Sequence, residues 1–242
     1  MKILNLGCGT KASPSPEVIN IDWSIELRLR SNPVSKYLIT ELVSGNRLNR
    51  FNSLPDNILV HNLSKGIPFA DNSVDVVYHS HFLEHLDRDV AECFLLEVKR
   101  VLKPGGIQRI VVPDLRKVCI SYLAHTEACE EDHSLVHQHD AYVGDILEQC
   151  VRREAYGSSQ QNRFWRTIEN VILGDARKRG ETHQWMYDEF NLCGLLRRLG
   201  YASPVVQSHA RSMISKWPEY ALDTDDAGEE YKPGSLYMEA TK

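Results

Sequence analysis

The sequence predicts an α/β protein built around a doubly wound, mostly parallel sheet. Strand-like and helix-like segments alternate from the first residues onward, which is typical of βαβ units. Residues 74–78 form an apolar run of the kind found in buried parallel strands. The chain has 242 residues, of which 42% are hydrophobic and 25% charged, close to the globular average. This length suits one large domain.

The first half of the chain supplies four predicted strands and one predicted helix. The strands are short apolar runs that end at glycine or at polar residues, and the helix stops at Gly45-Asn46. The strands are expected at residues 2–6, 18–21, 58–60 and 74–78, and the helix at 34–43.

The rest of the chain, after residue 78, supplies two amphipathic helices and three more strands. The first helix carries one apolar face and ends at Pro104-Gly105-Gly106. That face is formed by Val90, Phe94, Leu95, Val98, Val101 and Leu102. The second helix, at 188–199, has Phe190, Leu192, Leu195 and Leu196 as its apolar face. Strands are expected at 107–112, 203–207 and 235–240, the last two as an antiparallel pair at the sheet edge.

Residues 114–187 interrupt this alternation. They are polar, rich in His, Glu and Arg, and predicted to be mainly helical. We expect them to form an insertion over the carboxyl edge of the sheet, where open α/β sheets bind ligands. The domain prediction is therefore a single domain, 1–242, with 114–187 as a substrate cap.

Charge and cysteine usage narrow the class of protein. The 28 Lys and Arg against 33 Asp and Glu give a net charge of −5, which argues against a nucleic-acid binder. No apolar run approaches a membrane span, and the start has one cation and no signal-peptide pattern. The six cysteines form no Cys-x-x-Cys pair, so free thiols are expected. These features favour a cytoplasmic protein with no membrane partner.

The turn Gly7-Cys8-Gly9 after the first strand is the strongest ligand-binding signal. Its spacing to Ala12, with Asp22 further on, matches a loose dinucleotide fingerprint. A dinucleotide site needs a helix N-terminus for the pyrophosphate, but residues 10–17 are only eight residues and hold two prolines. A nucleoside without a pyrophosphate, such as S-adenosylmethionine, fits better.

Four segments give the chain a family resemblance. They are residues 4–9, 18–22, 67–86 and 100–106, in that order. With them the chain resembles class I S-adenosylmethionine-dependent methyltransferases, and more narrowly small bacterial methyltransferases of the type 11 kind associated with saccharides or secondary metabolites. The resemblance implies a Rossmann-like, seven-stranded sheet with an antiparallel last strand. It also implies methyl transfer to a small-molecule or saccharide acceptor, with oxygen the favoured acceptor atom.

The resemblance also implies roles for particular residues. Backbone at Gly7, Cys8 and Gly9 would line the methionine part of the cofactor, and Asp22 would accept hydrogen bonds from the ribose hydroxyls. The adenine would meet Trp23, Asn62 and Leu63, and the pocket floor would hold His79 and Ser80. Asn5 and Asn62 stand where the family often has a carboxylate, and each keeps a carbonyl acceptor for the cofactor. Trp23 could equally be a core aromatic.

Histidines are the candidate proton acceptors. The resemblance implies that His81 and His85 flank the pocket mouth, and His183 is a third candidate; an unperturbed imidazole titrates near pH ~6.5. Each could instead be a packed structural histidine.

A second group of residues has the spacing of metal ligands. His125, Cys129, His133 and His137 recur every four residues, followed by His139. Because Glu130-Glu131-Asp132 breaks the apolar pattern, a solvated face is favoured and no metal is predicted. Cations and aromatics also gather at Arg152, Arg153, Tyr156, Arg163, Phe164 and Trp165. These could serve an anionic or sugar-like acceptor, or form a solvated cap.

Two other functions stay open from the sequence. A non-catalytic binding module could retain this fold, given the neutral Asn5 and Asn62. A nucleotide-dependent oxidoreductase is disfavoured by the two prolines, and nucleic-acid methylation by the lack of an Asn/Asp-Pro-Pro-aromatic motif after the fourth strand. The acceptor and the oligomeric state are not predicted.

Overall fold

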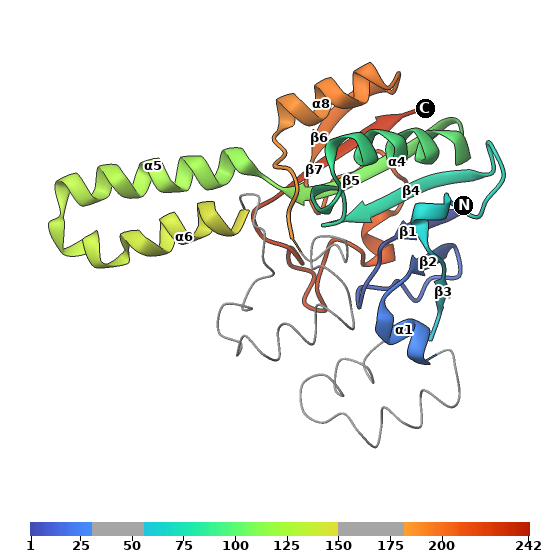
Figure 1. Ribbon diagram of the computed structural model, residues 1–242, viewed down its shortest axis with the longest axis horizontal. Coiled ribbons are helices and arrows are strands. Elements are labelled where there is room, and N and C mark those ends of the chain that lie inside the picture. Colours follow the sequence, from blue (N-terminus) through green and yellow to red (C-terminus); the bar gives the residue numbers. More distant parts are fainter. Residues whose placement is uncertain (31–55, 150–181) are drawn as a thin grey trace.

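A computed structural model describes residues 1–30, 56–149 and 182–242, and its centre is a seven-stranded sheet (Figure 1). The strand order is β3-β2-β1-β4-β5-β7-β6. The strands are β1 (Ile3–Leu6), β2 (Val18–Asp22), β3 (Ile58–Val60), β4 (Val74–Ser80), β5 (Leu102–Pro113), β6 (Ala202–Gln207) and β7 (Ser235–Thr241). All the strands predicted from the sequence are present. The helix predicted at 34–43 lies outside the described residues.

Strand direction follows the prediction of a mostly parallel sheet. β1 pairs in parallel with β2 and with β4, and β4 pairs in parallel with β5. β7 runs antiparallel between β5 and β6, so the last strand is inserted rather than added at the edge. The chain moves outward from β1 to β3 and then returns to β4 on the other side of β1. Open α/β sheets bind ligands at such a reversal, which here lies at the carboxyl ends of β1 and β4.

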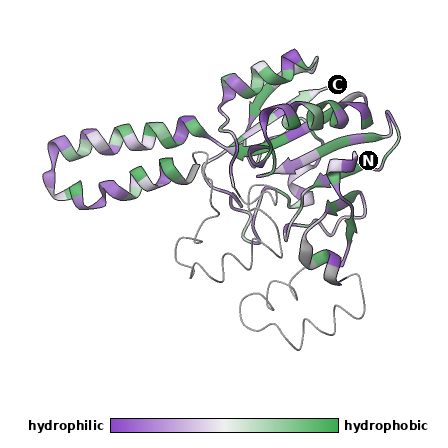
Figure 2. Cartoon of the chain, viewed as in Figure 1, coloured by the Kyte–Doolittle hydropathy of each residue, from purple (hydrophilic) through white to green (hydrophobic). Residues whose placement is uncertain are grey.

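Alternating residues of the strands feed two cores, one on each face of the sheet. Leu4, Val77 and Ile110 pack against α4 (Arg88–Val101) and α8 (Glu189–Arg198). Ile3 and its neighbours pack on the other face against η5 (Trp217–Tyr220). Figure 2 shows hydrophobic residues along the central strands and on the helices above them.

Three details of the predicted helix faces are wrong. Val90 and Phe190 are exposed, although both were placed on apolar faces. Phe190 lies two positions before the buried Leu192, which turns it about 200° away from the core at 100° per residue. Val90 lies in the first turn of α4, where Ala91 takes the buried position. Leu102 is the first residue of β5 rather than the last of the helix.

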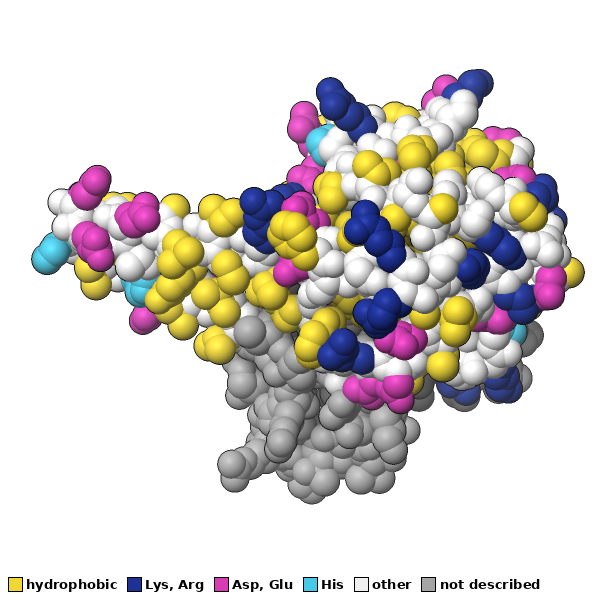
Figure 3. All heavy atoms as spheres, turned by 90° about the horizontal axis from the view of Figure 1, so that it is seen from above, with side chains coloured by type: hydrophobic (Ala, Val, Ile, Leu, Met, Phe, Trp, Pro, Cys, Tyr) yellow, Lys and Arg dark blue, Asp and Glu magenta, His cyan; other side chains and the backbone are white. Residues whose placement is uncertain are grey.

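The segment after β5 forms a projecting arm. It consists of α5 (Leu115–Glu131), η3 (His133–Gln138) and α6 (His139–Gln149), with the two α-helices side by side (Figure 1). The prediction of helices is confirmed for this part, but the arm extends away from the sheet instead of lying over its carboxyl edge. Figure 3 shows hydrophobic side chains along the arm, and Ile120 and Leu123 are exposed there. Residues 150–181 lie outside the described part.

The remaining described elements are short, and none has the character of a membrane span. They are α1 (Ile25–Arg30), η1 (Leu63–Lys65) and η2 (Leu83–His85). Within the described ranges, no helix is both long and apolar enough to cross a bilayer.

Candidate functional site

The glycine turn after β1 is fastened to the end of β2. The Gly7 N–H donates to the Ile21 carbonyl at 2.8 Å, and the Gly9 N–H donates to Asp22 Oδ2 at 2.8 Å. Both glycines have left-handed backbone, with φ of +65° and +53°. A Cβ on Gly7 would lie 2.5 Å from Cδ2 of Phe82, so the segment after β4 touches the turn. Glycine is therefore required at Gly7 both by conformation and by space.

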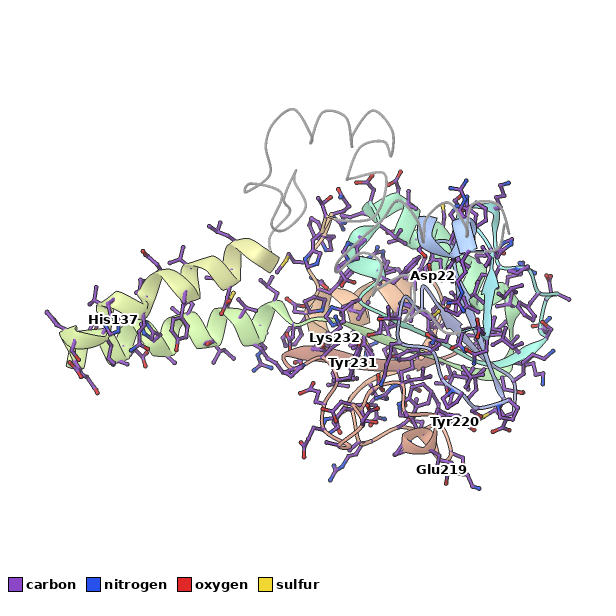
Figure 4. The ribbon with its side chains drawn as sticks, turned by 90° about the horizontal axis from the view of Figure 1, so that it is seen from below. Asp22, His137, Glu219, Tyr220, Tyr231 and Lys232 are labelled. Atoms are coloured by element: carbon purple, nitrogen blue, oxygen red, sulfur yellow. The ribbon has the colours of Figure 1, made fainter. Side chains whose placement is uncertain are left out.

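Asp22 is the charged residue of this turn. Its Oδ1 accepts the Ser24 N–H at 2.7 Å while its Oδ2 accepts from Gly9. Each carboxylate oxygen has a second lone pair, so the half-buried group can still accept two hydroxyl donors. Figure 4 labels Asp22 together with Tyr231 and Lys232, which precede β7. The geometry matches the expected ribose contact, which stays a prediction.

Cys8 offers its backbone rather than its side chain. The side chain is buried, and burial, together with the nearby Asp22 charge, raises the pKa of the thiol to about 12. The group therefore stays a thiol at neutral pH and is a poor nucleophile.

Asn5 braces the loop that follows the turn. Its Nδ2 donates to the Lys11 carbonyl at 3.0 Å and to Asn20 Oδ1 at 2.9 Å. Asn20 in turn donates to the Ser13 carbonyl at 3.0 Å. These buried amides explain why an amide suits this position: an amide donates to the loop carbonyl, which a carboxylate cannot do. The donor end of Asn5 therefore points to the protein and not to a ligand.

The residues expected around the adenine follow two neighbouring strands, Trp23 after β2 and Asn62 and Leu63 after β3. Trp23 is 42% exposed, so it is not a core aromatic and remains open to stacking. The Cζ atom of Arg28 lies 4.7 Å from the centre of its ring. Asn62 caps η1 by accepting the Ser64 N–H at 3.0 Å. Leu63 is partly buried against the core.

His79, which is expected in the pocket floor, has a side chain that is buried in the core of the sheet. It is a strand residue with a fully buried ring, 5.2 Å from the ring of Phe94, and its Nε2 is 3.0 Å from Gln108 Nε2. Burial lowers its pKa to about 3, so it is a neutral core histidine. Ser80 ends β4 and is partly exposed. Of this pair, Ser80 remains a candidate for contact through its side chain.

The three predicted catalytic histidines surround one carboxyl group that sequence reasoning gave no role. Glu84 is 1% exposed, and its Oε1 lies 3.4 Å from His81 Nδ1 and 3.8 Å from His85 Nε2. The rings of His85 and His183 are 4.9 Å apart. Ligand atoms of Glu84, His85 and His183 lie within 4.8 Å of one another. The structure thus brings all three histidines together around Glu84.

Burial sets the charge of this cluster. It raises the pKa of Glu84 to about 8, so the carboxyl group holds a proton at neutral pH. It lowers the pKa of His81 to about 3 and that of His85 to about 4, with the positive charge of Lys232 acting in the same direction. The close approaches to Glu84 are therefore not ion pairs at neutral pH. Sequence reasoning could have found Glu84 from one feature, namely an acidic residue that lies between His81 and His85 and directly follows an apolar leucine.

The histidine series in the arm is divided by the end of α5. His125, Cys129 and His139 gather, with 3.1 Å between the two Nδ1 atoms. His133 and His137 instead approach backbone carbonyls, so the five residues do not share one face. The cations and aromatics between Arg152 and Trp165 lie outside the described residues.

Comparisons with known proteins agree with this geometry. A family model described as a methyltransferase domain matches residues 34–110. A curated relative, an uncharacterized methyltransferase of Schizosaccharomyces pombe, is 31% identical over 127 residues. That match covers 49% of this chain and 42% of the relative, so it spans less than half of the relative's length.

Solved structures of similar shape have low sequence identity. A SAM-dependent methyltransferase from Archaeoglobus fulgidus has a TM-score of 0.42 at 13% identity, covering 100% of this chain and 86% of that one. One from Methanosarcina mazei has a TM-score of 0.45 at 18% identity, covering 100% and 92%. The fold assignment itself rests on strand order and direction.

The chain has a Rossmann-like α/β fold with the seven-stranded, mostly parallel sheet and antiparallel last strand that the resemblance implied. The matched methyltransferase domain and the curated methyltransferase relative agree with the methyl-transfer activity predicted from the sequence. Of the four segments that carry the resemblance, 67–86 and 100–106 fall inside the matched region, and 4–9 and 18–22 lie before it.

Proposed function

We propose that the protein transfers the methyl group of S-adenosylmethionine to a hydroxyl group of a small-molecule or saccharide acceptor. One observation carries the proposal: the left-handed glycine turn hydrogen-bonded to Asp22, in contact with the segment that holds Glu84 and its histidines. The turn offers close backbone approach and Asp22 offers ribose acceptors. The Glu84 cluster, which follows the end of the neighbouring strand β4, offers polar groups that could contact an acceptor.

The proposed cofactor contacts divide between backbone and side chains. Gly7, Cys8 and Gly9 would face the methionine part with their backbone, and Asn5 would hold their loop in place. Asp22 would accept the ribose hydroxyls. The adenine would lie near Trp23, Asn62 and Leu63, and Ser80 would lie below the cofactor.

The chemistry is an in-line displacement. The acceptor oxygen forms a bond to the methyl carbon as the carbon–sulfur bond breaks, and the bonding electron pair stays on sulfur to give S-adenosylhomocysteine. The hydroxyl proton moves to His81, His85 or His183. Because His81 and His85 are neutral at pH 7, each can receive a proton, but their low pKa values make them weak bases. Positioning therefore supplies most of the acceleration.

Calorimetric titration with S-adenosylmethionine and S-adenosylhomocysteine tests the cofactor site. We expect Asp22→Asn to weaken binding of both at least tenfold, about 1.4 kcal/mol, because an amide presents one acceptor oxygen where the carboxylate presents two. Asp188→Asn is the matched control, since Asp188 also accepts two backbone N–H groups but caps α8. The control should bind like the wild type.

The titration has two outcomes that overturn the proposal. If the wild type binds neither molecule, a non-catalytic module that retains the fold replaces the enzyme. If Asp22→Asn and Asp188→Asn behave alike, the ribose contact is wrong. Acceptor screening with radiolabelled S-adenosylmethionine then tests transfer to saccharides and other hydroxyl compounds.

A further inference from the structure

The Glu84 carboxyl group is buried without the hydrogen bonds that burial normally demands. Its side chain is 1% exposed, and neither oxygen accepts a hydrogen bond from any described residue. A buried polar group left in this state destabilises a protein by about 1–3 kcal/mol. Such a group in a folded structure indicates a missing partner.

We propose that Glu84, His85 and His183 bind a divalent transition-metal ion of the zinc class. The three residues present one carboxylate oxygen and two imidazole nitrogens within 4.8 Å of one another. Ligand atoms about 2.0–2.1 Å from a tetrahedral ion are roughly 3.4 Å apart, so modest side-chain rotation closes the set.

His85 is held with its lone pair facing the carboxyl group. Its Nδ1 lies 3.2 Å from the Thr182 carbonyl oxygen, which only accepts, so Nδ1 carries the hydrogen. The neutral ring then has an unprotonated Nε2, 3.8 Å from Glu84 Oε1. Metal-binding histidines are usually oriented in this way, by donating the other ring N–H to a carbonyl.

His81 shows the same arrangement from the other side of Glu84. The Ser235 hydroxyl donates to the Lys232 carbonyl at 2.7 Å, so it accepts from His81 Nε2 at 2.9 Å. His81 Nδ1 is therefore unprotonated and faces Glu84 Oε1 at 3.4 Å. The lone pairs of two histidines thus converge on one carboxyl oxygen. A single proton on Glu84 serves only one of them, whereas a cation satisfies several.

The backbone holds the ligand-bearing segments in fixed register. The Gln184 N–H donates to the Glu84 carbonyl at 2.6 Å, and the Trp185 N–H donates to it at 3.2 Å. Gln184 Nε2 also donates to the Thr182 carbonyl at 3.1 Å, which is the same oxygen that orients His85. His183 is therefore presented to Glu84 by a segment bonded to Glu84 itself. This preorganisation lowers the ordering cost of binding an ion.

The donor set selects the class of ion. Two imidazoles and one carboxylate suit zinc, cobalt or iron(II), whereas calcium and magnesium prefer all-oxygen sites. Three protein ligands leave a coordination position open to an acceptor oxygen. The positive charge of Lys232 acts against binding, so the affinity should be below that of a closed structural zinc site. The ion site does not depend on the proposed methyl transfer, because ion binding is measured without cofactor.

Metal titration of chelator-treated full-length protein tests the site. Zn²⁺ binding is measured by calorimetry and Co²⁺ binding by visible absorption. We expect the wild type to bind an ion whose affinity falls at least tenfold in Glu84→Gln and in His183→Ala. Cys129→Ala is the matched control, since Cys129 belongs to the other metal-prone group, with His125 and His139.

The outcomes separate the two groups of residues. Retained affinity in Cys129→Ala, together with a cobalt spectrum that lacks a thiolate charge-transfer band, supports the proposal. The proposal is overturned if Glu84→Gln binds the ion as tightly as the wild type does. It is also overturned if only Cys129→Ala loses ion binding, or if the wild type binds no ion. Circular dichroism confirms that each variant is folded. Binding of S-adenosylhomocysteine by each variant shows whether the proposed cofactor site fails independently of the ion site.

Discussion

Two clusters of buried acidic residues, one around Arg109 and one at Glu84, differ in how their carboxyl groups are paired. Asp223 and Glu239 share Arg109, which has no exposed surface, at 2.7 and 2.6 Å. Asp223 also accepts from Tyr78 Oη at 2.8 Å and from Trp217 Nε1 at 2.6 Å. Glu84, equally buried, accepts no hydrogen bond within the described residues.

The difference separates a structural cluster from a binding cluster. The Arg109 cluster joins β4, β5, β7 and the segment before β7, and its acceptors are satisfied inside the protein. It therefore has no spare lone pair aimed at a ligand. The Glu84 cluster lies at the carboxyl end of β4 with its nitrogen lone pairs turned toward one oxygen. Burial of an acidic residue alone does not mark a site, whereas an acidic residue buried without hydrogen-bond partners calls for an explanation.

Removing Arg109 should give the largest loss of stability. Arg109→Met leaves Asp223 and Glu239 buried and unpaired, so we expect the free energy of unfolding to fall by about 3–5 kcal/mol. Urea denaturation measures it. Arg198→Met is the control, because Arg198 pairs with Glu92 at 2.7 Å on the surface with a 58% exposed side chain. The control should change stability by less than about 1 kcal/mol, and equal losses would contradict the comparison.

Replacing Glu84 should have the opposite sign. In metal-free protein at pH 7, Glu84→Gln removes an unsatisfied buried acid and supplies an amide N–H that can donate to His81 or His85. We expect stability to hold or to rise by about 1 kcal/mol. Urea denaturation in the presence of chelator measures it, with Glu239→Gln as the matched control. A loss in Glu84→Gln as large as in Glu239→Gln would show that Glu84 has a structural partner.

The sheet was predictable from local patterns because its strands are apolar and its breaks are marked. The run from Val74, the glycines at Gly105 and Gly106, and the antiparallel edge pair all appear as expected. Helix faces were less predictable. Phe190 is apolar yet exposed, because the core contact of α8 begins only at Leu192.

The candidate site was predictable where backbone conformation dictates residue type. Gly7 and Asp22 follow from a tight turn beside a strand end. Glu84 was not found, since its importance depends on the tautomers of His81 and His85, and these are set by Ser235 and Thr182, far away in the sequence. The burial of the His79 side chain was not predicted for a different reason: position in a strand does not reveal which face of the sheet a side chain takes.

The smallest change in stability is expected for the half-exposed ion pair between Asp75 and Lys103. Asp75 Oδ1 accepts from Lys103 Nζ at 2.6 Å and Oδ2 accepts the Lys2 N–H at 2.7 Å, so its folded pKa lies below the usual value of about 3.9. An acidic group whose pKa is lowered by folding stabilises the fold at pH values above its unfolded pKa, and this contribution is lost as the pH falls through the folded pKa. We expect Asp75→Asn to lower stability by less than about 1 kcal/mol near pH 7, because both side chains are partly solvated. The difference from the wild type should shrink below about pH 4 and in high salt, as chemical denaturation across pH and salt would show. A difference that stays constant down to about pH 2 would mean that Asp75 acts through packing, in contrast to the charge pairing of the buried Arg109 cluster.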